Sequence, residues 1–325
     1  MANRGKSDAS LGKPWLVTGA AGYIGGHVIQ ALFDTGIPAV LLDIDQDSAR
    51  QKFSNEAIFE NCDIREKSDL ESLFARYSFE GVIHLAALKS VEDSQSMPKE
   101  YFETNVNGTR NILEVMNEFN VSKIIYSSSA AVYEAQSGEE LVNEESSLKP
   151  VSYYGQTKVD SEELILQFSQ KQKIMSVIFR YFNVAGAANP NLKDKSTQNL
   201  IPITINRIKL GIAPEIFGDD YNTPDGTAIR DYVDVRDIAN AHLKAVSYLS
   251  SNLESCVLNI GTGHGASVRE VISMAQEIMG INIAPIIKNR RPGDISAIAA
   301  DCTKAREVIG FESNYILREM IETSI

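Results

Sequence analysis

Cysteine and histidine are scarce in this chain of 325 residues. The three cysteines, Cys62, Cys256 and Cys302, are an odd and widely spaced set, so the sequence indicates neither a disulfide framework nor a paired-cysteine zinc motif. The four histidines are scattered and form no metal-ligand motif. We therefore expect no metal centre in this protein.

Long apolar runs and an excess of positive charge are also missing. No run of 18 apolar residues is present, which argues against a membrane-spanning helix. The formal net charge of −12 opposes nucleic acid or an anionic membrane as a general partner. Residues 1–14 are polar, do not resemble a signal peptide, and predict a disordered tail. We expect a cytoplasmic protein without nucleic-acid or membrane partners.

What the chain does have is an alternation of predicted strands and helices from residue 15 to residue 188. Such alternation builds a parallel sheet with helices on both faces, joined by right-handed crossovers. The alternation is lost over residues 189–325, which predict a second domain, although parts of 231–261 are suited to pack back on the first. The predicted fold class is α/β, a doubly wound (Rossmann) sheet with a smaller α+β domain.

A glycine pattern follows the first predicted strand. Gly19, Gly22 and Gly25 are spaced Gly-x-x-Gly-x-x-Gly between an apolar strand and a helix of apolar spacing that starts near Ile24. Glycines at such a turn allow a pyrophosphate to approach the backbone and the helix to pack closely on the strand. The phosphates then lie at the positive end of the helix dipole. The pattern predicts dinucleotide binding.

An acidic residue ends the next predicted strand, Ala39–Asp43, about 20 residues after the glycines, where a ribose diol is bound in such folds. The carboxylate of Asp43 would repel a 2′-phosphate, so we expect NAD rather than NADP.

Tyr154 and Lys158 stand four residues apart on a predicted helix. Residues at this spacing share one helix face, so the phenol and the ammonium point the same way. A fixed cation favours the phenolate, so Lys158 is predicted to lower the pKa of Tyr154 towards the working range of a base.

Together these residues resemble the extended short-chain dehydrogenases/reductases, and within that group the UDP-glucose 4-epimerase family. The resemblance covers nearly the whole chain from Trp15. Its further motifs, in order, are Leu85–Lys89, Thr104–Thr109, Ser127–Tyr133, Arg180–Asn183 and, most specific, Phe217–Tyr232.

The resemblance implies NAD-dependent inversion of C4 of a UDP-hexose, most simply UDP-galactose to UDP-glucose in galactose metabolism, through a transient 4-keto sugar. Tyr154 would act as the base, Lys158 would tune it, and Ser129 would assist at the 4-oxygen, although three consecutive serines leave that choice to alignment. Relatives often form homodimers, so we expect one here.

The resemblance also implies ligand contacts. The expected cofactor-binding residues are Gly19, Gly22, Tyr23, Ile24, Gly25, Asp43, Asp63, Ile64, Leu85, Ala86, Ala87, Lys89, Asn105, Tyr154, Lys158 and Phe182. The expected substrate-binding residues are Lys89, Ser129, Asn183, Asn199, Leu200, Phe217, Arg230, Arg291, Asp294 and Ile298.

Three alternatives stay open. A dehydratase of the same fold usually has an Asp-Glu pair where this chain has Ala130 and Ala131, which argues against it. A regulator with a dead site typically loses the tyrosine or the lysine, and both are kept. Ile298 replaces a bulky tyrosine found in some relatives, which leaves room for the N-acetyl group of UDP-GlcNAc/UDP-GalNAc, and a UDP-pentose is a further alternative substrate.

Overall fold

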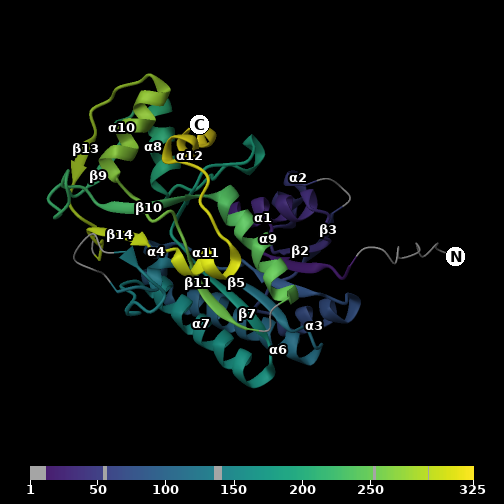
Figure 1. The fold of residues 1–325 in the computed structure, drawn as a ribbon. Coiled ribbons are helices and arrows are strands. Elements are labelled where there is room, and N and C mark those ends of the chain that lie inside the picture. Colours follow the sequence, from purple (N-terminus) through teal and green to yellow (C-terminus); the bar gives the residue numbers. More distant parts are fainter. Residues whose placement is uncertain (1–11, 54–56, 135–140, 252–253, 292) are drawn as a thin grey trace.

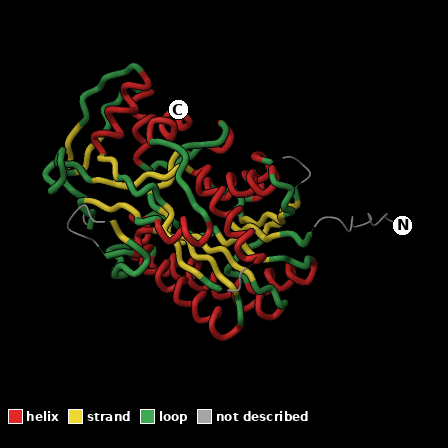
Figure 2. Tube along the Cα trace, in the orientation of Figure 1, coloured by secondary structure: helices red, strands yellow, loops and turns green. Residues whose placement is uncertain are grey.

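The computed structural model describes residues 12–53, 57–134, 141–251, 254–291 and 293–325. Most of the predicted disordered tail (residues 1–14) lies outside the described residues, which begin at Gly12. A large parallel sheet between helices forms one part, and a smaller group of strands and helices lies at its edge (Figures 1 and 2). In the described chain no helix is both long enough and apolar enough to span a bilayer.

The large sheet confirms the predicted doubly wound architecture. Its seven strands are all parallel, in the order β11-β7-β5-β4-β1-β2-β3. The strand order reverses at β1, and ligands bind at such a switch point beyond the carboxyl ends of the strands. The strands are β1 (Trp15–Thr18), β2 (Ala39–Asp43), β3 (Ile58–Asn61), β4 (Gly81–His84), β5 (Lys123–Ser129), β7 (Met175–Tyr181) and β11 (Cys256–Ile260).

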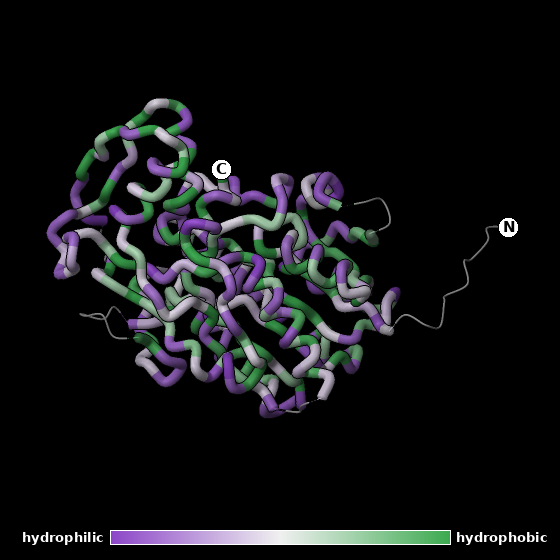
Figure 3. Tube along the Cα trace, turned by 45° about the horizontal axis from the view of Figure 1, so that its top comes forward, coloured by the Kyte–Doolittle hydropathy of each residue, from purple (hydrophilic) through white to green (hydrophobic). Residues whose placement is uncertain are grey.

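Each face of this sheet is covered by helices. Alternate strand residues point to opposite faces, so Val17 and Leu41 belong to one apolar core and Leu16 and Val40 to the other. Hydrophobic segments accordingly run through the interior in Figure 3. One core is covered by α1 (Tyr23–Asp34), α9 (Val235–Ser251) and α11 (Thr303–Ile309), and the other by α3 (Lys67–Arg76), α6 (Gly108–Glu118) and α7 (Tyr153–Gln172).

The helical stretch from Pro98 to Glu118 is divided into three. It comprises α5 (Pro98–Tyr101), a π-helical turn (Phe102–Asn107) and α6. A π-turn inside a helix often marks a functional position, and this one carries Asn105. At Gly108 a side chain would come within 2.6 Å of Ile64, so glycine lets α6 approach the end of β3 closely.

The smaller part holds two further sheets. One has the order β12-β10-β14-β6, with β8 also paired to β10, and the other pairs β13 with β9. Their strands are β6 (Leu141–Val142), β8 (Asn183–Ala185), β9 (Glu215–Phe217), β10 (Ile229–Asp234), β12 (Gly265–Ser267), β13 (Ile286–Lys288) and β14 (Ala297–Ala300). The remaining helices are α2 (Gln46–Lys52), α4 (Val91–Ser96), α8 (Leu200–Lys209), α10 (Val268–Met279), α12 (Leu317–Ser324) and the short 3₁₀ turns Ala130–Val132 and Pro190–Leu192.

Three segments after residue 188, namely α9, β11 and α11, lie in the large part. Helix α9 packs on α1, and β11 pairs with β7 at the edge of the large sheet. The chain therefore crosses between the two parts more than once. The division at residue 188 stays a prediction.

Candidate active site

A cavity of about 840 Å³ opens at the carboxyl ends of the parallel strands, a size usual for small-molecule sites. It brings together most of the residues predicted from the sequence. The predicted residues that line it are Gly19, Gly22, Tyr23, Ile24, Gly25, Asp43, Asp63, Ile64, Leu85, Ala86, Ala87, Lys89, Ser129, Tyr154, Lys158, Phe182, Asn183, Asn199, Leu200, Arg230, Asp294 and Ile298.

Three predicted residues do not line this cavity: Asn105, Phe217 and Arg291. The guanidinium carbon of Arg291 lies 4.0 Å from the ring centroid of Phe217, so these two side chains contact each other. Asn105 is buried behind the wall of the cavity. Direct contact of these three residues with a ligand stays a prediction.

The glycine turn requires its glycines. Gly19 has φ of +76°, and a side chain there would lie 2.7 Å from the Ala86 nitrogen. A side chain at Gly25 would lie 2.2 Å from the Gly19 oxygen. Helix α1 then begins at Tyr23, and its first residue is preceded by Gly22, which offers no side-chain cap. The N–H groups of the first turn are thus available to an anion.

Asp43 is held against this turn. One carboxylate oxygen accepts a hydrogen bond from the Ala21 nitrogen at 2.8 Å, and the other from the Asp45 nitrogen at 2.9 Å. The carboxylate is therefore fixed between the glycine turn and the residues after β2, at the edge of the cavity.

An ion pair follows β3. Arg65 donates to Asp63 at 2.5 Å, and this hydrogen bond is the main cause that lowers the pKa of the Asp63 carboxyl. Arg65 lines the cavity although the sequence analysis did not select it. A planar guanidinium beside a cofactor pocket can stack on a flat ring as well as pair with an acid.

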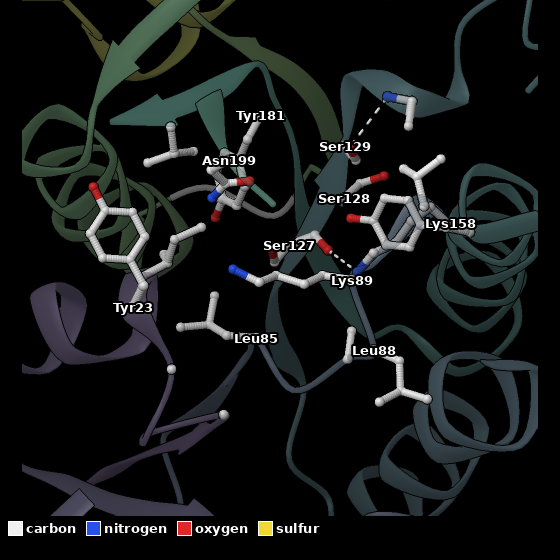
Figure 4. Close-up of a pocket in the computed structure, with 18 of the residues that line it drawn as sticks. Tyr23, Leu85, Leu88, Lys89, Ser127, Ser128, Ser129, Lys158, Tyr181 and Asn199 are labelled. Atoms are coloured by element: carbon white, nitrogen blue, oxygen red, sulfur yellow. Dashed lines mark hydrogen bonds between the residues drawn. The ribbon is translucent and has the colours of Figure 1, made fainter. Parts of the chain in front are cut away.

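Residues Leu85–Lys89 form one wall of the cavity, and hydrogen bonds hold this segment near both of its ends. The Thr18 hydroxyl accepts from the Leu85 and Ala86 nitrogens, each at 3.2 Å. The Asn105 amide accepts from the Leu88 nitrogen at 2.8 Å and donates to the Leu88 oxygen at 3.0 Å. The Lys89 side chain extends from this wall into the cavity (Figure 4). Asn105 thus shapes the cavity from behind.

Helix α7 brings Tyr154 and Lys158 to the end of β5. Ser152 caps the helix by accepting from the Gly155 nitrogen at 3.0 Å. A side chain at Gly155 would lie 2.3 Å from the Ala131 oxygen, so glycine permits this close approach. The Lys158 ammonium lies 5.8 Å from the Tyr154 ring centroid.

The three serines at the end of β5 differ in direction, because strand residues alternate between faces. The Ser128 hydroxyl donates to the buried Glu162 carboxylate. The Ser129 hydroxyl accepts from the Ala131 nitrogen at 3.2 Å (Figure 4), and its interaction with the Tyr154 phenol acts to lower the pKa of that phenol. Of the three serines, Ser129 is therefore the one that acts on the phenol.

The expected lowering of the Tyr154 pKa by Lys158 is not found. Burial raises the pKa of Tyr154 to about 12, and the hydrogen bond from Ser129 only partly opposes this. Burial also lowers the pKa of Lys158 to about 7, against the field of Glu162. The lysine is itself desolvated, which disfavours its ammonium form, and its charge is not among the causes that shift the pKa of the phenol.

Polar side chains from the smaller part close the cavity. Asn183 begins β8, and Asn199 precedes α8. Arg230 on β10 donates to the Asp294 carboxylate and to the Ile295 oxygen, the latter at 2.9 Å. These bonds fix the guanidinium at the cavity wall.

Ile298 on β14 is also part of the wall. Its side chain is only 8% exposed and packs with Val132, Tyr133 and Phe182. An apolar, well-packed residue therefore faces the cavity at this position.

The sequence analysis missed other lining residues. Tyr181 stood in the quoted run Arg180–Asn183, beside the selected Phe182, and its hydroxyl is 2.9 Å from the His242 Nε2. Thr104 and Tyr232 likewise stood in quoted motifs, whereas most of the others lie in segments that carry no motif. These others include Ile44, Val91, Glu100, Val151 and Ile295.

Known proteins resemble the whole chain. A UDP-glucose 4-epimerase of Halalkalibacterium halodurans is 39% identical over 94% of this chain and 93% of the relative. That of Bacillus subtilis is 34% identical over 95% of each.

Solved structures agree with these relatives. The UDP-glucose 4-epimerase of Stenotrophomonas maltophila, with bound NAD and formylated UDP-arabinopyranose, matches with a TM-score of 0.90 at 33% identity, over 96% of this chain and 97% of the other. The UDP-Glc/GlcNAc 4-epimerase of Campylobacter jejuni matches with a TM-score of 0.84 at 34% identity, over 96% and 98%. Residues 15–261 match the model of a family described as NAD dependent epimerase/dehydratase. This chain belongs to that NAD-dependent epimerase/dehydratase family.

Proposed function

We propose that the protein inverts C4 of a UDP-hexose, most simply converting UDP-galactose to UDP-glucose, with bound NAD. One observation carries the proposal: Ser129, Tyr154 and Lys158 meet at the end of β5, in the cavity into which the glycine turn opens. The curated relatives are UDP-glucose 4-epimerases over nearly their full length, which supports the same reaction here.

Each of the three side chains has a task at the sugar. Tyr154 takes the proton of the 4-hydroxyl as the carbon is oxidised and returns a proton when it is reduced. Ser129 hydrogen-bonds the phenol and the 4-oxygen and relays that proton. Lys158 binds the cofactor's ribose. When NAD⁺ is bound, it supplies the hydride acceptor and donor, and its positive ring favours the phenolate.

One end of the cavity binds the cofactor, and the other binds the sugar nucleotide. The N–H groups at the start of α1 hold the cofactor's pyrophosphate, and the Asp43 carboxylate accepts from the ribose diol. Arg230 binds the diphosphate of the sugar nucleotide, since a guanidinium donates two parallel hydrogen bonds to phosphate oxygens. Asn183 and Asn199 contact the same substrate.

A dehydratase function has less support. Elimination of water needs an acid and a base beside the oxidised sugar. The positions after Ser129 are Ala130 and Ala131, and both line the cavity in the 3₁₀ turn after β5. Methyl groups there cannot move a proton, so epimerisation is the better reading.

We also propose that the protein works in the cytoplasm as a homodimer. Cys62, Cys256 and Cys302 are free thiols, which suits a reducing compartment. Phe102 in the π-helical turn and Phe119 directly after α6 expose 36% and 38% of their surface, so this helical region offers apolar side chains to a partner subunit. Light scattering of the purified protein measures the mass directly, and a monomer at micromolar concentration would contradict the dimer.

The proposed activity is tested by incubating the purified protein with UDP-galactose and resolving the products by chromatography. We expect UDP-glucose to form without added NAD, because the protein carries bound NAD and regenerates it in every turnover. No conversion with either hexose, or a product that has lost water, would contradict the proposal.

A further inference from the structure

A buried ion pair lies directly behind the proposed active site. Arg180 belongs to the motif Arg180–Asn183, yet no role above uses it. Its guanidinium donates to the Glu162 carboxylate at 2.7 Å, and the two side chains are only 5% and 3% exposed. A second guanidinium nitrogen donates to the same carboxylate at 3.1 and 3.2 Å.

The pair is the centre of a larger network. The Glu162 carboxylate also accepts from the Ser128 hydroxyl. The remaining guanidinium nitrogen of Arg180 donates to the Tyr133 hydroxyl and to the Glu144 carbonyl oxygen, each at 3.1 Å. Tyr133 in turn donates to Asn259 at 2.5 Å. Helix α7, strands β5, β7 and β11 and the segment after β6 are thus tied to one guanidinium.

The network joins the two elements whose alignment the chemistry needs. Glu162 lies one helical turn after Lys158 on α7. Ser128 lies between Ser127, whose carbonyl oxygen accepts from Lys158 at 2.6 Å, and Ser129, which contacts the phenol. The bond from Ser128 to Glu162 therefore fixes the strand end relative to the helix at the very residues that flank the reacting groups. A misplacement of about 1 Å can reduce a rate about 100-fold.

Stability alone is a weak reason for such a pair. Removing two charges from water costs much of what their attraction returns, so apolar residues of similar size often stabilise as well. Apolar residues could not form the directional hydrogen bonds by which this network joins α7, β5, β7, β11 and the segment after β6. Glu162 has one further effect, because its negative charge favours the ammonium form of Lys158.

We propose that Glu162 and Arg180 are positioning residues for C4 inversion: through Ser128 they hold the end of β5 in register with α7, so that Ser129, Tyr154 and Lys158 converge. The proposal rests on the proposed function. It predicts a loss in turnover rather than in substrate binding when the network is cut.

The first test compares two buried serines of the large sheet. Ser128→Ala removes only the hydroxyl that ties β5 to Glu162. Ser176→Ala, the control, removes an equally buried hydroxyl at the far end of β7, which hydrogen-bonds Ser169 at 3.0 Å. We expect kcat for UDP-galactose to fall at least about tenfold in Ser128→Ala with KM within about twofold, and to be unchanged in the control.

The second test uses the pH profile, which a purely structural role would not move. Glu162→Gln can still accept from Ser128 but carries no charge, so the pKa of Lys158 falls and the alkaline limb of the kcat profile shifts to lower pH. Ser128→Ala leaves that limb in place. The groups that face Lys158 are the Ser127 carbonyl, the Tyr126 and Tyr154 rings, the neutral His84 and Glu162.

The outcomes separate the two proposals. If the unmodified protein does not convert UDP-galactose, the proposed function fails before any variant is compared. If it does, and Ser128→Ala keeps the kcat of Ser176→Ala, the positioning role is overturned. It is equally overturned if Ser128→Ala raises KM while kcat holds. Should Glu162→Gln fail to fold, the serine comparison still decides.

Discussion

The Lys158 ammonium donates a 2.6 Å hydrogen bond to the backbone oxygen of Ser127. This bond fixes the lysine of α7 to the strand end that carries Ser129, so the helix and the strand are aligned by backbone as well as by side chain. It also gives the buried ammonium a strong acceptor. The lysine is therefore held in place although burial disfavours its charged form.

Tyr154→Phe removes the proposed proton acceptor and keeps the ring's packing. We expect kcat to fall at least about 100-fold, the lower end for general acid–base catalysis, with UDP binding largely retained. Tyr153→Phe, on the neighbouring residue that does not line the cavity, serves as the control and should keep its rate. Near-normal turnover by Tyr154→Phe would show that another group takes the proton.

Lys158 should make stability depend on pH. Burial lowers its pKa to about 7 from an unfolded value of about 10.4, so between these values the unfolded chain binds more protons and stability rises with pH. Below about pH 7 the folded protein must bury the ammonium itself. Lys158→Met should therefore raise the melting temperature of the nucleotide-free protein more at pH 6 than at pH 9.

Lys171→Met, on the exposed end of the same helix, is the control and should change little at either pH. An equal effect of Lys158→Met at both values would mean that the lysine is not destabilised by burial.

Asp43 should select NAD over NADP. Asp43→Ala removes the carboxylate that would repel a 2′-phosphate, so we expect weaker NAD binding and a smaller preference for NAD, measured by cofactor titration. Asp43→Ala also removes the acceptor of the Ala21 nitrogen in the glycine turn. Asp45→Ala removes a nearby exposed carboxylate that caps α2 and should leave the preference intact. Tighter binding of NADP by the unmodified protein would be the contrary result.

Ile298 should influence the choice of sugar. Isoleucine is shorter than tyrosine, so the wall can recede enough to accept an N-acetyl group at C2. We expect turnover of UDP-GlcNAc and UDP-GalNAc as well as of the plain hexoses, with the N-acetylated pair lost selectively in Ile298→Tyr. Rates for both substrate pairs check this. If the unmodified protein does not turn over the N-acetylated pair, the prediction is wrong. The packing of Ile298 against Phe182 would then leave no room for the N-acetyl group.

Local patterns were enough to predict the large sheet and most of the cavity. The glycine spacing, the acid at the end of β2 and the Tyr154–Lys158 pair each depend on one strand–helix unit, and strand ends meet at one edge of a parallel sheet. The direction of Ser128 away from the phenol also follows from strand alternation, although the sequence alone did not show where the strand ends.

Long-range packing was beyond such patterns. Arg65 enters the cavity because Asp63 turns it there. Arg291 stacks on Phe217, a contact between segments far apart in the chain. The pKa of Tyr154 failed as a prediction for the same reason, because the helical spacing to Lys158 says nothing of how deeply both groups are buried.

Retention of the hydride at C4 tests the central claim most directly. The purified protein is incubated with UDP-galactose that carries deuterium at C4, without added NAD, and the isolated UDP-glucose is analysed by mass spectrometry and NMR. If the bound cofactor takes the hydride and returns it to the opposite face, the product keeps its deuterium at C4. Formation of UDP-glucose without the label, or its exchange with solvent, would contradict the account.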